Sequence, residues 1–113
     1  FGLAAMESAY THGHPWLERL LTYLDGNRQL IHTTLADTPI GFTLPESTYL
    51  AWLDFRHFGL DDPQLRDKIV QEAGLGLNPG VQFGEEGSGF MRLNFALPRP
   101  RLQKALDQLK KHF

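Results

Sequence analysis

Cysteine is absent from the 113-residue sequence. Without a thiol the chain forms no disulfide, no thiolate metal site and no cysteine nucleophile, which fits a reducing compartment such as the cytoplasm. Long apolar runs are also missing, and none approaches the roughly 20 residues that a helix needs to span a bilayer. The first residues lack the basic start and apolar core of a secretory signal. We therefore expect a cytoplasmic protein with no membrane partner.

An excess of charge of either sign is lacking as well, since 13 acidic and 11 basic residues give a net charge of −2. No basic field attracts nucleic acid, so we expect no nucleic-acid partner. Large apolar side chains are abundant: 42% of the residues are hydrophobic, and they include eight Phe, three Tyr and two Trp. This composition is typical of one globular domain with a real core.

The chain opens with Phe1 and no methionine, within a segment, Gly2–Tyr10, that has helical apolar spacing and no capping residue before it. We expect it to be a piece of a longer protein. Pro15 opens a second helix, and its apolar residues keep helical phase past Gly26. One long helix with a weak point at Gly26 is favoured over two shorter ones.

Two further helices and several strands follow. The third helix is predicted to start with Asp62 as its cap, and the last to start at Pro100. Strands are predicted at 48–55 and 90–97, with short extended pieces at 40–44, 75–77 and 81–83, a turn at 78–80 and a flexible acidic loop at 84–89. The fold class that this order indicates is a two-layer α+β sandwich, with a small, mostly antiparallel sheet of three to four strands and helices packed on it, preceded by the long helix.

Most candidate sites have a simpler structural explanation. His12 and His14 lack the further ligands of a zinc site, so we expect no metal. The glycine-rich loop 84–89 carries two carboxylates and no P-loop lysine, which disfavours phosphate binding. The four lysines fall on helices, and none has the desolvated pocket of a Schiff-base lysine. We expect no catalytic residue and no cofactor-binding residue in this chain.

Arg92 is the exception. It interrupts the strand 90–97, whose apolar residues alternate, and Asn94 lies two residues further on the same face. One interpretation is an arginine in an ion pair on a half-exposed sheet face. The other is that Arg92 and Asn94 point into a cleft, where a guanidinium fork binds a small acid through two parallel hydrogen bonds. The pattern alone does not decide between them.

Three segments resemble a known group of enzymes: PESTYLAWLDFR at 45–56, VQFG at 81–84 and GFMRLNFALPR at 89–99. They are similar to the C-terminal part of pyridoxal-phosphate enzymes of the aspartate aminotransferase fold. Within that group they most resemble the cystathionine β-lyase or C–S lyase branch. The leading helices at 3–5 and 16–28 match as well, so the resemblance covers nearly the whole chain.

The resemblance implies a division of the chain and a role for one residue. Residues 1–13 would end a large cofactor domain, 14–36 would form the interdomain helix, and 37–113 the small C-terminal domain. Arg92 would bind the α-carboxylate of an amino-acid substrate, with Asn94 supporting it. The lysine that binds pyridoxal phosphate, and the other residues that hold it, would lie in the large domain, so the chain alone should be inactive and bind no cofactor.

The resemblance thus predicts a parent enzyme, a homodimer, that cleaves the C–S bond of cystathionine or a related cysteine derivative. The alternatives are an aminotransferase of the same fold, or a non-catalytic α/β module that binds a small acid or a protein. Because the large domain would cover the first helices, we expect Leu3, Met6 and Trp16 to be exposed in this chain.

Overall fold

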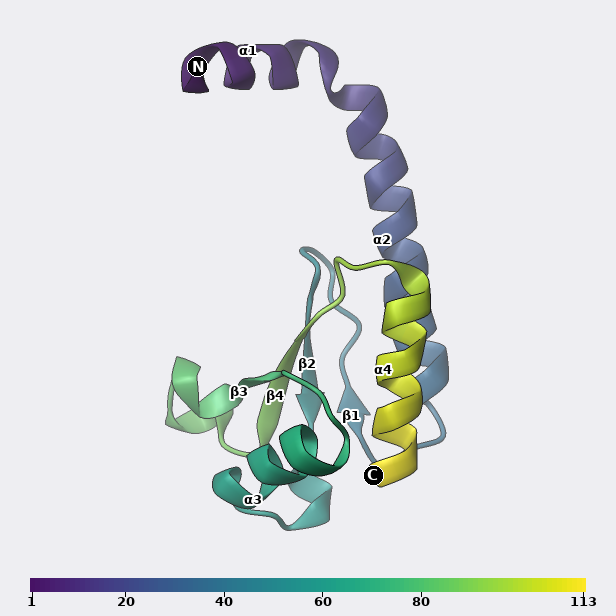
Figure 1. The fold of residues 1–113 in the computed structure, drawn as a ribbon, viewed down its shortest axis with the longest axis vertical. Helices are drawn as coiled ribbons and strands as arrows, with labels where there is room; N and C mark the ends of the chain where they lie inside the picture. The colour runs from purple at the N-terminus through teal and green to yellow at the C-terminus, as the bar shows by residue number, and fades with distance from the viewer.

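The computed structural model describes all 113 residues as a small α+β domain with a helical arm (Figure 1). The arm consists of α1 (Gly2–His12) and the first half of α2 (His14–Leu35), and the molecule measures 50 × 28 × 24 Å. α2 is continuous through Gly26, which confirms the prediction of one long helix. A Cβ at Gly26 would lie 2.4 Å from Arg99 Nη2, so the glycine admits the arginine that packs across the helix.

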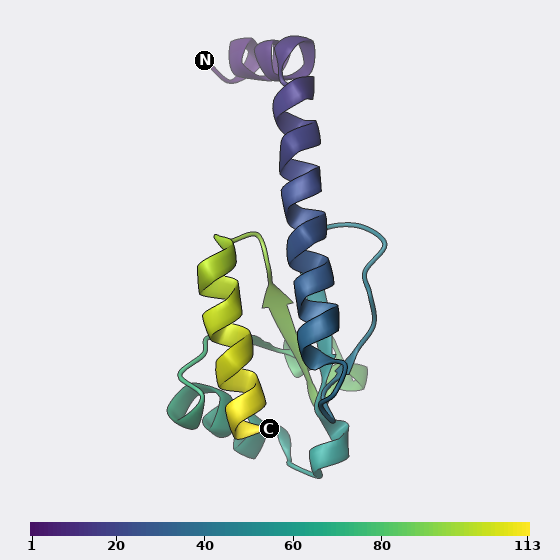
Figure 2. The same cartoon turned by 90° about the vertical axis from the view of Figure 1, so that its right-hand side faces the viewer.

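Four antiparallel strands form one sheet in the order β1-β2-β4-β3. They are β1 (Gly41–Phe42), β2 (Leu50–Asp54), β3 (Asn78–Pro79) and β4 (Phe90–Asn94). The second half of α2 lies beside α4 (Arg99–His112), and both helices cover the same face of the sheet (Figure 2). The fold class predicted from the sequence is therefore confirmed.

The core lies between this helical layer and the sheet. Ala51 and Leu53 of β2 and Met91 and Leu93 of β4 point into it, as the alternation of these strands predicts. The helices and connecting segments supply the other residues of this core cluster, which are Ile31, Leu35, Ile40, Phe55, Leu65, Ile69, Phe95, Leu102, Leu106 and Leu109. The other side of the sheet, here called the open face, is not covered by α2 or α4 and includes Trp52, Arg92 and Asn94.

Both long strands are shorter than the sequence predicts. β2 begins at Leu50 because Thr48 has a positive φ of 67°, a conformation that breaks the extended chain. β4 ends at Asn94, whose side-chain Oδ1 accepts a hydrogen bond from the Ala96 N–H and turns the backbone. Likewise only Gly41–Phe42 of the extended piece at 40–44 forms a strand, and α4 begins one residue before Pro100, at Arg99.

The region 61–89 departs most from the predictions. Asp61, not Asp62, caps α3 (Asp62–Asp67), and the helix continues as a π-helix over Lys68–Glu72. Asn78–Pro79, predicted as a turn, pairs with β4, and the predicted strand 81–83 is a 3₁₀ turn, Gly80–Phe83. A Cβ at Gly80 would lie 2.1 Å from the Gly87 carbonyl oxygen, so this turn packs closely on the next one, Glu85–Gly87.

Candidate functional site

Arg92 lies in the middle of the open face, flanked on both sides by neighbouring strands. It pairs with Trp52 of β2 and with Asn78 of β3. Strand pairing on both sides fixes the backbone of Arg92, so its side chain starts from a rigid position. The side chain is half-buried, and no carboxylate lies within ion-pair distance of it. The ion-pair interpretation of Arg92 is therefore wrong for this chain.

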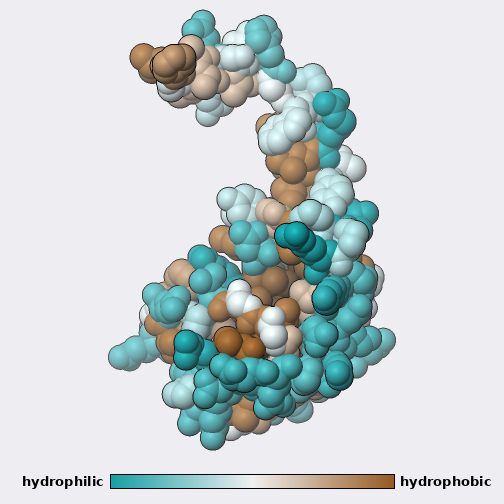
Figure 3. All heavy atoms as spheres, viewed as in Figure 1, coloured by the Kyte–Doolittle hydropathy of each residue, from teal (hydrophilic) through white to brown (hydrophobic).

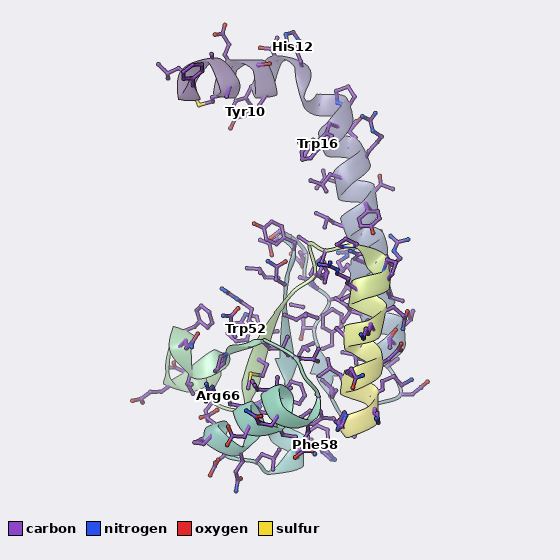
Figure 4. The ribbon with its side chains drawn as sticks, in the orientation of Figure 1. Tyr10, His12, Trp16, Trp52, Phe58 and Arg66 are labelled. Atoms are coloured by element: carbon purple, nitrogen blue, oxygen red, sulfur yellow. The ribbon has the colours of Figure 1, made fainter.

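An aromatic ring, not an acid, contacts the Arg92 guanidinium. Its Cζ lies 4.4 Å from the centre of the Phe83 ring, a cation–π contact. Phe83 meets Trp52 edge to face at 5.6 Å, and Trp52 meets Phe90 in the same way at 6.1 Å. These three rings, with Glu86 and Gly87, line a hollow of about 270 Å³, and Phe83 is the residue of this lining that contacts Arg92. Trp52 is labelled in Figure 4.

The donors of Arg92 are only partly used. Nη2 donates to Asn78 Oδ1 over 3.3 Å, while Nε is buried and has no acceptor. A guanidinium carries five N–H donors, so most of its hydrogen-bonding capacity is free. An arginine on a rigid strand, with free donors and no carboxylate within ion-pair distance, has the chemistry of an anion site, and a carboxylate fits its planar fork best.

Asn94 lies on the same face as Arg92 but makes no contact with it. Its Oδ1 accepts from the Ala96 N–H at 2.9 Å, which makes Asn94 a cap on the end of β4. The amide N–H groups of Asn94 remain exposed. The sequence missed Phe83, Asn78 and Trp52 as neighbours of Arg92, because only the strand order shows that they meet.

A second hollow, of about 230 Å³, lies where α2 faces the segment before β2. Arg28 crosses it, and one of its Nη atoms donates to the Pro45 carbonyl oxygen at 2.8 Å while the other binds Asp25. The segment contains Thr48, the non-glycine residue with a positive φ. Because Arg28 is already paired with an acid, this hollow is a weaker anion site than Arg92.

The one acid whose pKa is shifted, Asp54, lies at the C-terminal end of β2. Arg56 donates from Nε to Asp54 Oδ1 at 2.9 Å and from Nη2 to Oδ2 at 2.7 Å. These hydrogen bonds hold the pKa of Asp54 below its ordinary value, against a smaller effect of burial, and they raise the pKa of Arg56. Arg56 is thus engaged and is not a second site for a substrate acid.

The remaining candidates stay on the surface. His14 pairs with Glu18 at 3.2 Å, and no cluster of His, Asp and Glu is spaced to hold a metal ion. Lys68 pairs with Glu72 at 3.0 Å, and Lys104, Lys110 and Lys111 are exposed on α4. None of the helices is both long enough and apolar enough to cross a bilayer.

The arm presents an uncovered apolar surface, visible as brown atoms on α1 and the upper part of α2 (Figure 3). Leu3, Met6 and Trp16 are 80%, 54% and 62% exposed, which confirms the prediction made for them. Tyr10 and Trp16 point into the angle between α1 and α2, whereas His12 points outward (Figure 4). No residue of α1 is buried.

Comparison with known proteins places this architecture in a family. The family model described as aminotransferase class I and II matches residues 2–109. The chain belongs to this family. It is 40% identical over 109 residues to protein MalY of Escherichia coli, and 37% identical over 112 residues to cystathionine beta-lyase PatB of Bacillus subtilis. These alignments cover 95% and 97% of the chain but only 28% and 29% of the relatives.

A solved structure agrees in detail. Cystalysin from Treponema denticola, which contains a pyridoxal 5'-phosphate cofactor, superposes with a TM-score of 0.93 at 30% identity, over 98% of this chain and 29% of that one. The resemblance to the C–S lyase branch is therefore confirmed. The chain spans less than a third of the length of these relatives, and the match includes the arm.

Proposed function

We propose that this chain is the substrate-binding part of a pyridoxal-phosphate-dependent C–S β-lyase of the cystathionine β-lyase type. Residues 1–13 end the large cofactor domain, 14–36 form the interdomain helix and 37–113 the small C-terminal domain. Relatives three times as long as this chain, and the uncovered apolar arm, support this division. The large domain would cover α1 and the upper half of α2.

The observation that carries the proposal is the free guanidinium of Arg92 on the open face. Every substrate of such an enzyme is an amino acid, and its α-carboxylate is the anion that a two-pronged arginine binds and orients. Asn94 supports that carboxylate with its exposed amide N–H groups. The net reaction removes the α-proton, breaks the bond between the β-carbon and sulfur, and yields the thiol, pyruvate and ammonium after addition of water.

The residues of this chain do not form a site for pyridoxal phosphate. Three of its lysines are exposed on α4 and the fourth is paired with Glu72, so none is placed to bind the cofactor. When bound, the cofactor withdraws electrons from the α-carbon of the substrate. We assign it to the large domain, which also supplies the acid–base groups, and the role of this chain is to bind and orient the carboxylate. The parent enzyme is proposed to be a cytoplasmic homodimer.

The test is the product formed by the full-length protein. We expect it to release pyruvate from cystathionine without any added 2-oxo acid, which a coupled lactate dehydrogenase assay measures. An aminotransferase, favoured by the name of the family, would instead need a 2-oxo acid and return a new amino acid. Absence of both reactions would favour the non-catalytic module and contradict the proposal.

A further inference from the structure

Hydrogen bonds alone do not set the orientation of the Arg92 guanidinium. Its one acceptor, Asn78 Oδ1, lies at the long distance of 3.3 Å from Nη2. A single bond at one corner leaves the plane of the group free to rotate about that corner. The buried Nε has no acceptor that would oppose such a rotation. Another contact must therefore hold the plane.

Phe83 provides that contact. Its ring centre lies 4.4 Å from Arg92 Cζ, close enough for the planar group and the ring to attract each other. The ring itself is braced: Trp52 meets it edge to face at 5.6 Å and an interplanar angle of 88°. The 3₁₀ turn that carries Phe83 begins at Gly80, which packs directly on Gly87.

This arrangement also selects which edge of the guanidinium faces outward. Nε is buried, and Nη2 donates to Asn78. Nη1 makes no hydrogen bond and is not buried. The edge formed by Nη1 and Nη2 is thus the accessible one. A carboxylate can meet it with two parallel hydrogen bonds.

We propose that Phe83 is a positioning residue for Arg92: its ring holds the guanidinium plane so that the Nη1–Nη2 edge receives the substrate carboxylate end-on. This inference rests on the proposed role of Arg92. It adds that recognition of the carboxylate depends on the aromatic ring of Phe83, in the turn after β3. Phe83 does not touch the carboxylate itself.

The experiment measures how much affinity the carboxylate contributes. L-Alanine carries the α-carboxylate, and L-alaninamide has a neutral amide in its place. The dissociation constant of L-alaninamide divided by that of L-alanine, measured by calorimetry on the full-length holoprotein, therefore gives the contribution of the carboxylate to binding. For Phe83→Leu we expect the ratio to fall about two- to fivefold, the value of one exposed cation–π contact. Phe83→Tyr keeps a ring and should preserve the ratio. Gln82→Leu introduces the same residue at the next exposed position and should also preserve it.

Arg92→Ala separates the two levels of the proposal. If Arg92→Ala brings the ratio close to one while Phe83→Leu leaves it unchanged, the carboxylate role stands and the positioning role of Phe83 is overturned. If Arg92→Ala itself leaves the ratio unchanged, the proposed role of Arg92 is wrong. A fall in Phe83→Leu that Phe83→Tyr does not rescue would also contradict the role of the ring. Thermal unfolding of each variant verifies that it is folded.

Discussion

Asn27 joins the long helix to the segment that follows β4, the strand that carries Arg92. Its Nδ2 donates to the carbonyl oxygens of Phe95 and Leu97, both at 3.0 Å, and its Oδ1 accepts from Arg99 Nε at 3.1 Å. The side chain is fully buried, and its amide donors and its acceptor are all used. This explains why the Asp-Gly-Asn sequence at 25–27, which elsewhere favours a turn, lies within a helix.

Replacing Asn27 should therefore destabilise the domain strongly. Asn27→Leu keeps the volume but leaves buried carbonyl groups without donors, which costs about 2–3 kcal/mol of unfolding free energy. Urea unfolding followed by circular dichroism measures the loss. Gln29→Ala, on the exposed side of the same helix, is the control and should change stability by less than about 0.5 kcal/mol. Equal stability of the two variants would contradict the role given to Asn27.

The stability of the domain should depend on pH because of Asp54. Arg56 holds the pKa of Asp54 below its ordinary value of 3.8 in the folded chain. A lowered folded pKa contributes stability above about pH 4, and this contribution is lost as the pH falls through the folded pKa. Asp54→Asn should thus show a shallower loss of stability below pH 4 than the unchanged chain in urea unfolding across pH 2–6. A slope identical to that of the unchanged chain would show that the pair does not stabilise the fold.

Single positions also show how far the sequence alone can predict. Alternation in β4 predicted that Met91 and Leu93 are buried and that Arg92 faces the other way, because a period of two is a local property of a strand. It did not predict Phe83 as the neighbour of Arg92. That contact depends on β3 lying beside β4, which no local pattern of residues 78–83 indicates.

At the scale of elements, the start of α3 shows how two adjacent aspartates take different roles. Asp61 Oδ1 accepts from the Gln64 N–H at 2.8 Å, and Gln64 Oε1 accepts from the Asp61 N–H, forming a capping box. Asp62 instead binds Ser88 Oγ at 2.8 Å and the Gly89 N–H at 2.9 Å. The sequence could not separate these roles, since the partner of Asp62 lies 26 residues away.

The cap is open to direct measurement. Asp61→Ala removes the side-chain acceptor and should lower the free energy of unfolding by about 1 kcal/mol, the usual value for an N-cap. Gln71→Ala, exposed further along the same helical segment, is the control. Were chemical denaturation to give the same midpoint for both variants, Asp61 would not be the effective cap.

At the scale of the whole molecule, α1 and the domain are energetically separate. α1 buries none of its residues, so it contributes almost nothing to the stability of the sheet and its helices. Deleting residues 1–13 should change the unfolding free energy of the remaining chain by less than about 0.5 kcal/mol in urea. A larger loss would mean that α1 packs on the domain and is not held free for another surface.

The sequence predicted the long helix and the two longer strands well, because their apolar residues recur with helical and strand periods. It did not predict the order of the strands in the sheet, which depends on contacts between distant segments. The resemblance to C–S lyases suggested the ligand that we propose for Arg92, an α-carboxylate, which periodicity could not indicate. We propose that the opposite wall of this site belongs to the large domain of the parent protein, which lies outside these 113 residues.

The central claim is that Arg92 binds the substrate carboxylate, and the kinetics of Arg92→Ala in the full-length protein test it most directly. Loss of a charge-assisted hydrogen bond is worth about 1.5–3 kcal/mol, so kcat/KM for cystathionine cleavage should fall about ten- to a hundredfold. Arg66→Ala, which removes an exposed arginine from α3, should leave kcat/KM within about twofold of the unchanged enzyme. An unchanged kcat/KM in Arg92→Ala would contradict the account.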